Sequence, residues 1–204
     1  DGRISWSGPH FERREVIWPL GSRESDPRLL DLLKTIRVED ESLVVDPRNR
    51  GIANVCVRYA DGNLAPAPIG ATAEIRVKNM RAEPRSIAVE PGRHVVIVND
   101  DPITHTLAIL AFGDQPIGEA RLAQGERVDL GAVQGAGIGV RSRQFPFLGA
   151  LVFAGSKGPQ WITGSNGSFR FAGVPVGKAQ IEITHPMLGR RTFEVEIVAD
   201  ETTK

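Results

Sequence analysis

The chain has 204 residues, which is long enough for one large β domain or for two small ones. Its 25 basic and 25 acidic residues cancel, so no surplus of positive charge points to a nucleic-acid partner. The longest apolar runs fall far short of about 18 residues, so we expect no membrane span.

The single cysteine, Cys56, excludes an internal disulfide and any multi-cysteine metal centre. The chain begins with Asp1 rather than Met, which is compatible with removal of a targeting segment. We expect an exported protein, either periplasmic or extracellular.

One short helix is predicted near residues 26–35. Ser25-Asp26-Pro27 offers a capping residue followed by a proline at an early helical position. Leu29, Leu30, Leu32 and Leu33 then form an apolar stripe that ends near Lys34. The 22 glycines and 14 prolines indicate that the rest of the chain has many turns and few long helices.

The middle of the chain reads as a series of strands. Residues 73–78 alternate between apolar and charged side chains, and residues 95–98 are apolar on both faces. A turn at Pro91-Gly92 separates these runs, and two further strands are expected at residues 104–112 and 151–153. This spacing is typical of a two-sheet sandwich.

The last fifty residues predict a meander with one buried face. Turns are expected at Ser165–Ser168 and Val174–Gly177, where Asn and Gly tolerate positive φ angles. The strands that follow alternate apolar and polar residues over 179–184 and 193–197.

Residues 71–154 resemble the cupredoxins, and in particular the cupredoxin-like proteins often labelled methylamine utilization protein in bacterial genomes. The stretches that carry this resemblance are Val77–Pro84, Val89–Gly92 and Asn99–His105, with Asp40–Val45 and Gly51–Tyr59 similar to the family's opening segments. The resemblance implies a Greek-key β-sandwich.

A second resemblance covers Thr163–Ala199. Its Thr-Gly-Ser-Asn-Gly-Ser-Phe-Arg-Phe run, followed by Gly173–Gly177, is similar to the carboxypeptidase regulatory-like or transthyretin-like (prealbumin-like) β-sandwich. The motif is informative about fold and says almost nothing about activity. The expected fold class is therefore all-β, with two sandwiches and one helix.

The cupredoxin-like resemblance implies a copper loop that has lost its ligands. A blue-copper site needs two imidazoles and one thiolate, usually with a weak axial thioether. His105 occupies the first imidazole position, and residues 142–148 match the family's Cys-x-x-His-Pro-x-Met loop. In that loop Ser142 stands at the thiolate position, Phe145 at the second imidazole position and Leu148 at the thioether position.

These replacements predict a hydrophobic plug where copper would lie. Neither Phe145 nor Leu148 has a lone pair that suits copper, and a serine hydroxyl does not ionise near neutral pH as a thiol can. We therefore expect no metal and no cofactor, with His105 the one weak candidate ligand. That imidazole should be neutral and hydrogen-bonded locally, with Ser142 a candidate partner.

The other candidate side chains have ordinary structural interpretations. His94 is expected to be packed or half-exposed, His10 and His185 to be solvated, and Cys56 to be a small semi-buried residue rather than a reactive thiol. Three tryptophans could offer a binding platform but are expected in the core. They are Trp6, Trp18 and Trp161. Four arginines could form a rim contact or a solvated surface. They are Arg141, Arg143, Arg190 and Arg191.

Two domain layouts are open. In the favoured one, residues 1–70 and 155–204 together form the transthyretin-like sandwich, and residues 71–154 form a cupredoxin-like domain inserted between its halves, with Ala65–Pro68 at the boundary. In the alternative the two domains lie in tandem, and the first seventy residues add strands to the cupredoxin-like one.

Three functions remain open. The favoured one is a non-catalytic structural or protein-interaction module that works outside the cytoplasm with other protein chains. The alternatives are a small-ligand or carbohydrate-binding accessory module, and a copper-binding electron-transfer protein. Because the sequence has no Gly-x-Ser-x-Gly elbow, no phosphate-binding loop and no His-Glu-x-x-His motif, we do not expect an enzyme.

Overall fold

A computed structural model gives the arrangement of these elements. The residues that it describes are 1–9, 15, 16, 26–60, 72–112, 114–155 and 158–198. Over these residues the regular secondary structure is nearly all β-strand, with one short helix, as expected. None of the described helices is long and apolar enough to cross a membrane.

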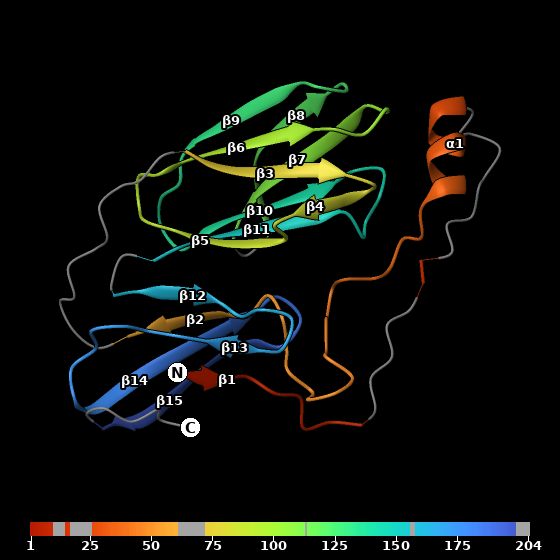
Figure 1. The fold of residues 1–204 in the computed structure, drawn as a ribbon. Helices are drawn as coiled ribbons and strands as arrows, with labels where there is room; N and C mark the ends of the chain where they lie inside the picture. Colours follow the sequence, from red (N-terminus) through yellow and green to blue (C-terminus); the bar gives the residue numbers. More distant parts are fainter. Residues whose placement is uncertain (10–14, 17–25, 61–71, 113, 156–157, 199–204) are drawn as a thin grey trace.

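The larger sandwich is formed by the middle of the chain (Figure 1). Its strands are β3 (Ala73–Lys78), β4 (Arg81–Glu83), β5 (Ser86–Val89), β6 (His94–Asn99), β7 (His105–Ala111), β8 (Gln115–Leu122), β9 (Arg127–Ala132), β10 (Gly137–Ser142) and β11 (Gly149–Ala154). They form one sheet in the order β5-β11-β10-β7-β8 and another in the order β4-β3-β6-β9.

Each sheet of this sandwich contains one parallel pair, β5 with β11 and β3 with β6, while the other pairs are antiparallel. A parallel pair cannot be joined by a tight hairpin, so the chain crosses between the sheets in a Greek-key path. Strand β6 is central in its sheet, and Val95–Val98 are buried on both of its faces, as the sequence predicts.

The smaller sandwich combines strands from both ends of the chain. These are β1 (Gly2–Arg3), β2 (Cys56–Tyr59), β12 (Gln160–Ile162), β13 (Ser168–Phe169), β14 (Gly177–His185) and β15 (Gly189–Ile197). One antiparallel sheet has the order β12-β2-β14-β15, and β1 pairs with β13. Residues 1–60 and 158–198 therefore share sheets, whereas the strands of residues 72–155 pair only among themselves.

Helix α1 (Pro27–Thr35) forms for the reasons read from the sequence. The Asp26 side chain accepts a hydrogen bond of 3.0 Å from the Arg28 amide, and Pro27 fills a position whose N–H would have no helical partner. Its buried residue Leu29 joins the core of the larger sandwich, as do Val16 and Val38. The N-terminal segment thus contributes to both cores, although the favoured layout assigned all of it to the smaller sandwich.

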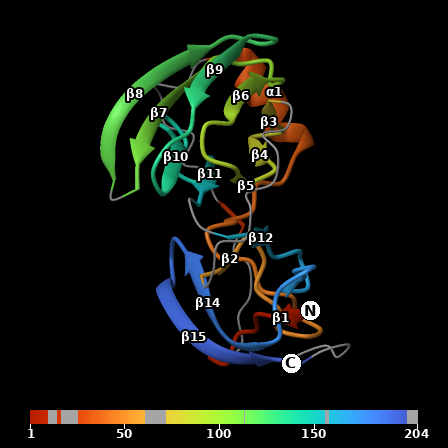
Figure 2. The ribbon, with the colours of Figure 1, turned by 90° about the vertical axis from the view of Figure 1, so that its left-hand side faces the viewer.

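Two hydrophobic cores lie inside the two sandwiches. The larger is centred on Ile75, Ile97, Leu107 and Val152, and the smaller on Val55, Val57 and Ala179. Figure 2 shows the sandwiches one above the other, with the tip of the β14–β15 hairpin pointing toward the larger one.

Candidate functional site

The loop that is predicted to be a former copper loop, residues 142–148, connects β10 to β11 at one end of the larger sandwich. It closes on itself through backbone bonds, since the Ser142 amide donates to the Leu148 carbonyl at 2.9 Å and the Leu148 amide donates to the Phe145 carbonyl at 2.9 Å. The Ser142 hydroxyl oxygen accepts from the Gln144 and Phe145 amides at 3.2 and 3.1 Å. Serine therefore fixes the loop as a hydrogen-bond acceptor.

The loop's two apolar residues lie in the core. Phe145 is 4% exposed and Leu148 is 1% exposed, and both belong to the hydrophobic cluster of the larger sandwich. The Phe145 ring meets the His105 ring edge to face, with centroids 5.8 Å apart. Phe145 and Leu148 thus pack as ordinary core residues, and Phe145 lies beside the imidazole.

His105 begins β7 and is fully buried. Its Nε2 lies 3.0 Å from Oδ2 of Asp101, a carboxylate that is 1% exposed. The same Asp101 oxygen accepts from the Met80 amide at 3.0 Å. The prediction of Ser142 as the partner of His105 is wrong, because Nε2 pairs with Asp101 and Nδ1 has no hydrogen-bond partner.

A further buried polar side chain, Asn99, holds the backbone around this pair through hydrogen bonds. Asn99 is fully buried, and its amide group donates to the Ile103 and Leu122 carbonyls at 2.8 and 3.0 Å. Its oxygen accepts from the Asp101 amide at 2.9 Å. The turn between β6 and β7 is therefore a buried polar network, and it aims Asp101 at the imidazole while the neighbouring Asp100 faces Arg76.

These residues do not fit a blue-copper centre. His105 Nδ1 is buried without a hydrogen-bond partner, so one imidazole nitrogen remains as a candidate donor. The other three positions of the predicted copper loop hold a hydroxyl oxygen and two hydrocarbon side chains. A blue-copper centre instead selects a thiolate and a second imidazole. Among the described residues, no group of three or more His, Cys, Asp or Glu side chains comes together as a metal site.

Two of the other histidines have clear places, and one of them differs from the expectation. His94 is exposed, with Nδ1 2.9 Å from Asp129 Oδ2. His185 was expected to be solvated, but it is 4% exposed, because the hairpin tip that carries it turns inward against the larger sandwich. Burial and the nearby charge of Arg85 lower the pKa of His185 to about 4. His10 lies outside the described residues.

Cys56 is a buried strand residue in β2, 4% exposed. Burial raises the pKa of its thiol to about 12, so the thiolate is strongly disfavoured near neutral pH. The expectation of a small structural residue fits this setting, with deeper burial than the sequence suggested.

The described tryptophans and surface arginines have separate local environments. Trp161 is 45% exposed, whereas Trp6 packs against the smaller core and donates its indole N–H to the Pro9 carbonyl at 2.8 Å. Trp18 lies outside the described residues. Three of the arginines form ion pairs on the surface, namely Arg141 with Asp114, Arg143 with Glu119 and Arg190 with Glu182.

Comparison with known proteins gives partial matches to solved cupredoxin structures. No family model matches the chain, and no curated protein matches it. A purple cupredoxin from Nitrosopumilus maritimus is 18% identical over 41% of this chain and 99% of its own, with a TM-score of 0.37. Amicyanin from Paracoccus versutus is 14% identical over 45% of this chain and 85% of its own, with a TM-score of 0.37. The copper-containing nitrite reductase of Thermus scotoductus SA-01 is 17% identical over 48% of this chain and 25% of its own, also with a TM-score of 0.37.

Proposed function

We propose that this chain is a non-catalytic, exported interaction module in which a cupredoxin-like sandwich serves as a scaffold without copper. The observation that carries the proposal is the packing at the former ligand positions. Phe145 and Leu148 lie in the hydrophobic core, and the remaining imidazole of His105 is held by Asp101. Burying a Phe or a Leu side chain contributes on the order of 1.5–3 kcal/mol, so this arrangement favours stability over metal binding.

The pairing of strands supports a split domain layout. Because β1 pairs with β13 and β2 pairs with β12 and β14, the two ends of the chain depend on each other for their sheets. We propose that the cupredoxin-like sandwich is inserted into a transthyretin-like sandwich, with α1 extending from the outer domain to cover the inserted one. A copper-free scaffold of this kind would hold the outer sandwich and its edges in position.

Strand β15 is the surface that we propose for a partner chain. It forms the edge of its sheet, and its only sheet partner among the described strands is β14. An edge strand presents unpaired N–H and C=O groups that an extended segment of another protein can join. Phe193 on β15 is 47% exposed, although its cross-strand neighbour Ile181 is 8% exposed on the same sheet face. An apolar residue beside an open edge suits a partner strand with apolar side chains on alternate positions.

The copper part of the proposal is tested with the purified protein and a variant that restores the donor set. After incubation with Cu(II) and desalting, the wild-type chain should retain far less than one copper and show no intense band near about 600 nm. The triple variant Ser142→Cys, Phe145→His, Leu148→Met should bind copper with intense visible absorption if residues 142–148 are a former copper loop. Stoichiometric copper in the wild type would overturn the proposal.

The partner part is tested by photo-crosslinking in cells of the source organism. Phe193 is replaced by the photoreactive amino acid p-benzoylphenylalanine, and Ile117 on β8, which is 60% exposed, is replaced in the same way as a matched control. A defined crosslinked protein is expected at position 193 alone, and it should disappear when Thr192→Pro interrupts the edge. Equal crosslinking from both positions, or none from position 193, would contradict a partner site on β15.

A further inference from the structure

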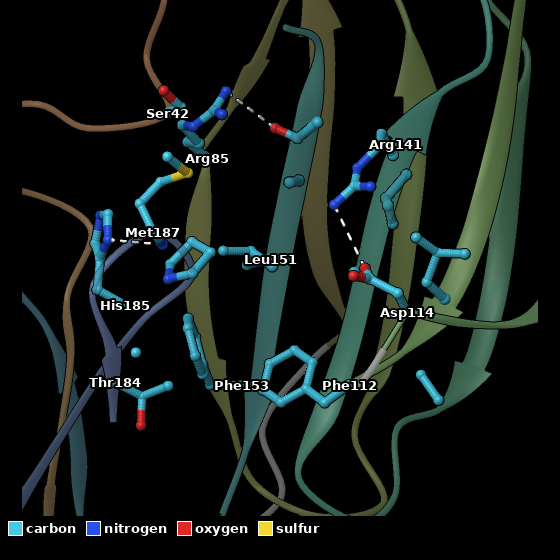
Figure 3. A pocket seen from close by; sticks show the side chains of 18 of the residues that line it. Ser42, Arg85, Phe112, Asp114, Arg141, Leu151, Phe153, Thr184, His185 and Met187 are labelled. Atoms are coloured by element: carbon cyan, nitrogen blue, oxygen red, sulfur yellow. Dashed lines mark hydrogen bonds and ion pairs between the residues drawn. The ribbon is translucent and has the colours of Figure 1, made fainter. Parts of the chain in front are cut away.

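A cleft of about 590 Å³ lies between the two sandwiches, apart from the former copper loop's buried core. One wall is the outer face of β7, β10 and β11, and the other is the tip of the β14–β15 hairpin with His185 and Met187 (Figure 3). This volume falls within the range of small-molecule sites, which is roughly 300–1,000 Å³.

The floor of the cleft is apolar and is hollowed by glycine. Gly139 lies opposite Leu151 in the β10–β11 register, so both positions face the cleft. Beside them Phe112 and Phe153 meet edge to face, with ring centroids 5.3 Å apart. A Cβ atom at Gly139 would stand 3.7 Å from Leu151 Cδ2, an ordinary contact, so the absence of a side chain there leaves space rather than relieving a clash.

The cleft also contains a cation that forms no direct ion pair among the described residues. Arg85, just before β5, donates from Nη1 to the Phe147 and Gly149 carbonyls at 3.2 and 3.4 Å, and within the described part of the chain it forms no ion pair. Burial lowers the pKa of Arg85, because the charged form has lost part of its hydration. A partly buried guanidinium whose hydrogen bonds go only to neutral carbonyls is stabilised by contact with an anion.

The other two arginines that line the cleft are already compensated. Arg141 pairs with Asp114 at 3.5 Å, and Arg190 pairs with Glu182 at 2.6 Å. Arg85 has no direct ion pair among the described residues, although the charges of Glu41 and Asp40 act on it, so an anion in the cleft has one preferred end. Figure 3 shows Arg85 and Ser42 at one side of the cleft, with Phe112 and Phe153 away from them.

His185 adds a donor to the wall of the cleft. Its Nδ1 accepts from the Met187 amide at 3.2 Å, so the neutral imidazole carries its proton on Nε2. The cleft therefore combines a guanidinium, a neutral imidazole N–H and the Ser42 hydroxyl with an aromatic and aliphatic floor.

We propose that this cleft binds an apolar carboxylate, an organic acid with a single anionic group and a hydrocarbon body. The carboxylate pairs with Arg85, with His185 and Ser42 available as further donors. The hydrocarbon body lies along Leu151, Phe153 and Phe112, in the space left by Gly139. A purely polar anion would leave the apolar floor unused, and an uncharged lipid would leave Arg85 uncompensated.

The test is calorimetric titration of the full chain with octanoate, with 1-octanol and acetate as probes that carry only the chain or only the charge. Octanoate is expected to bind at one saturable site, at least about tenfold more tightly than either probe. An N-acetylated dipeptide ending in Phe, as the free acid and as the amide, distinguishes a peptide C-terminus from a small acid as the source of the carboxylate. Preference for the free acid in either series supports the proposal.

Three variants show whether binding occurs in the cleft. Arg85→Gln removes the charge and Gly139→Val fills the floor, and each should weaken octanoate binding by about tenfold or more. Arg143→Gln, which removes an exposed arginine paired with Glu119 outside the cleft, should change affinity by less than about twofold. Near-UV circular dichroism establishes that each variant is folded, and Gly139→Val carries the test if Arg85→Gln is not. No saturable binding of either octanoate or the dipeptide acid, or equal weakening by Arg143→Gln, would overturn the proposal.

Discussion

His105 and Asp101 form a fully buried pair at the start of β7, with Nε2 and Oδ2 3.0 Å apart. The carboxylate does more than orient the ring, because it also accepts the Met80 amide at the β3–β4 turn. One side chain thus connects the turn before β7 to the opposite sheet.

Replacing this carboxylate should be costly. In Asp101→Ala, both the His105 Nε2–H and the Met80 amide lose their acceptor in a site without solvent, and each unsatisfied donor costs about 1–3 kcal/mol. We expect the free energy of unfolding in urea to fall by roughly 2–4 kcal/mol. Asp100→Ala is the matched control, since Asp100 is only half-buried and pairs with the exposed Arg76, and its loss should be much smaller. Equal losses of unfolding free energy in the two variants would mean that burial of the His105–Asp101 pair adds no extra stability.

The Leu148 side chain, in the loop between β10 and β11, should behave as a core residue. Leu148 is 1% exposed, so Leu148→Ala leaves a cavity and should destabilise the chain by about 2–5 kcal/mol. Leu148→Met, which changes shape while keeping volume, should cost less than about 1.5 kcal/mol. Urea unfolding followed by tryptophan fluorescence measures both. A small loss for Leu148→Ala would indicate that the loop is not packed into the core.

Local sequence patterns predict the helix and the central strand, but they do not predict the buried polar turn or the contact between the two sandwiches. The Asp26-Pro27 start of α1 and the two-faced apolar run at Val95–Val98 are local patterns, and both were predicted correctly. The roles of Asp100 and Asp101 were not separable in this way, because adjacent carboxylates in a turn look alike until the turn geometry aims one inward. The burial of His185 comes from contact between the two sandwiches, which leaves no periodic pattern in the strand that carries it.

Two glycines on β10, Gly137 and Gly139, differ in how much strain an added side chain would cause. Gly137 has a φ of 124°, and a Cβ atom there would overlap the Val152 carbonyl oxygen, whereas Gly139 has room for one. Gly137→Ala should therefore lower the unfolding free energy by about 2 kcal/mol or more, and Gly139→Ala should change it by less than about 1 kcal/mol. Thermal unfolding of the two variants gives the comparison, and similar midpoints would contradict the tight approach of β10 to β11 at Gly137.

Acid should weaken the chain through His185. Its folded pKa of about 4 lies below the ordinary value of 6.5, because burial and the charge of Arg85 disfavour the imidazolium form. The unfolded chain then binds more protons than the folded chain between these values, so stability is fully present above about pH 6.5 and declines as the pH falls toward about 4. The decline from this residue is at most about 3 kcal/mol. Urea unfolding at a series of pH values should show it in the wild type and not in His185→Gln, and parallel curves for the two proteins would place the acid sensitivity elsewhere.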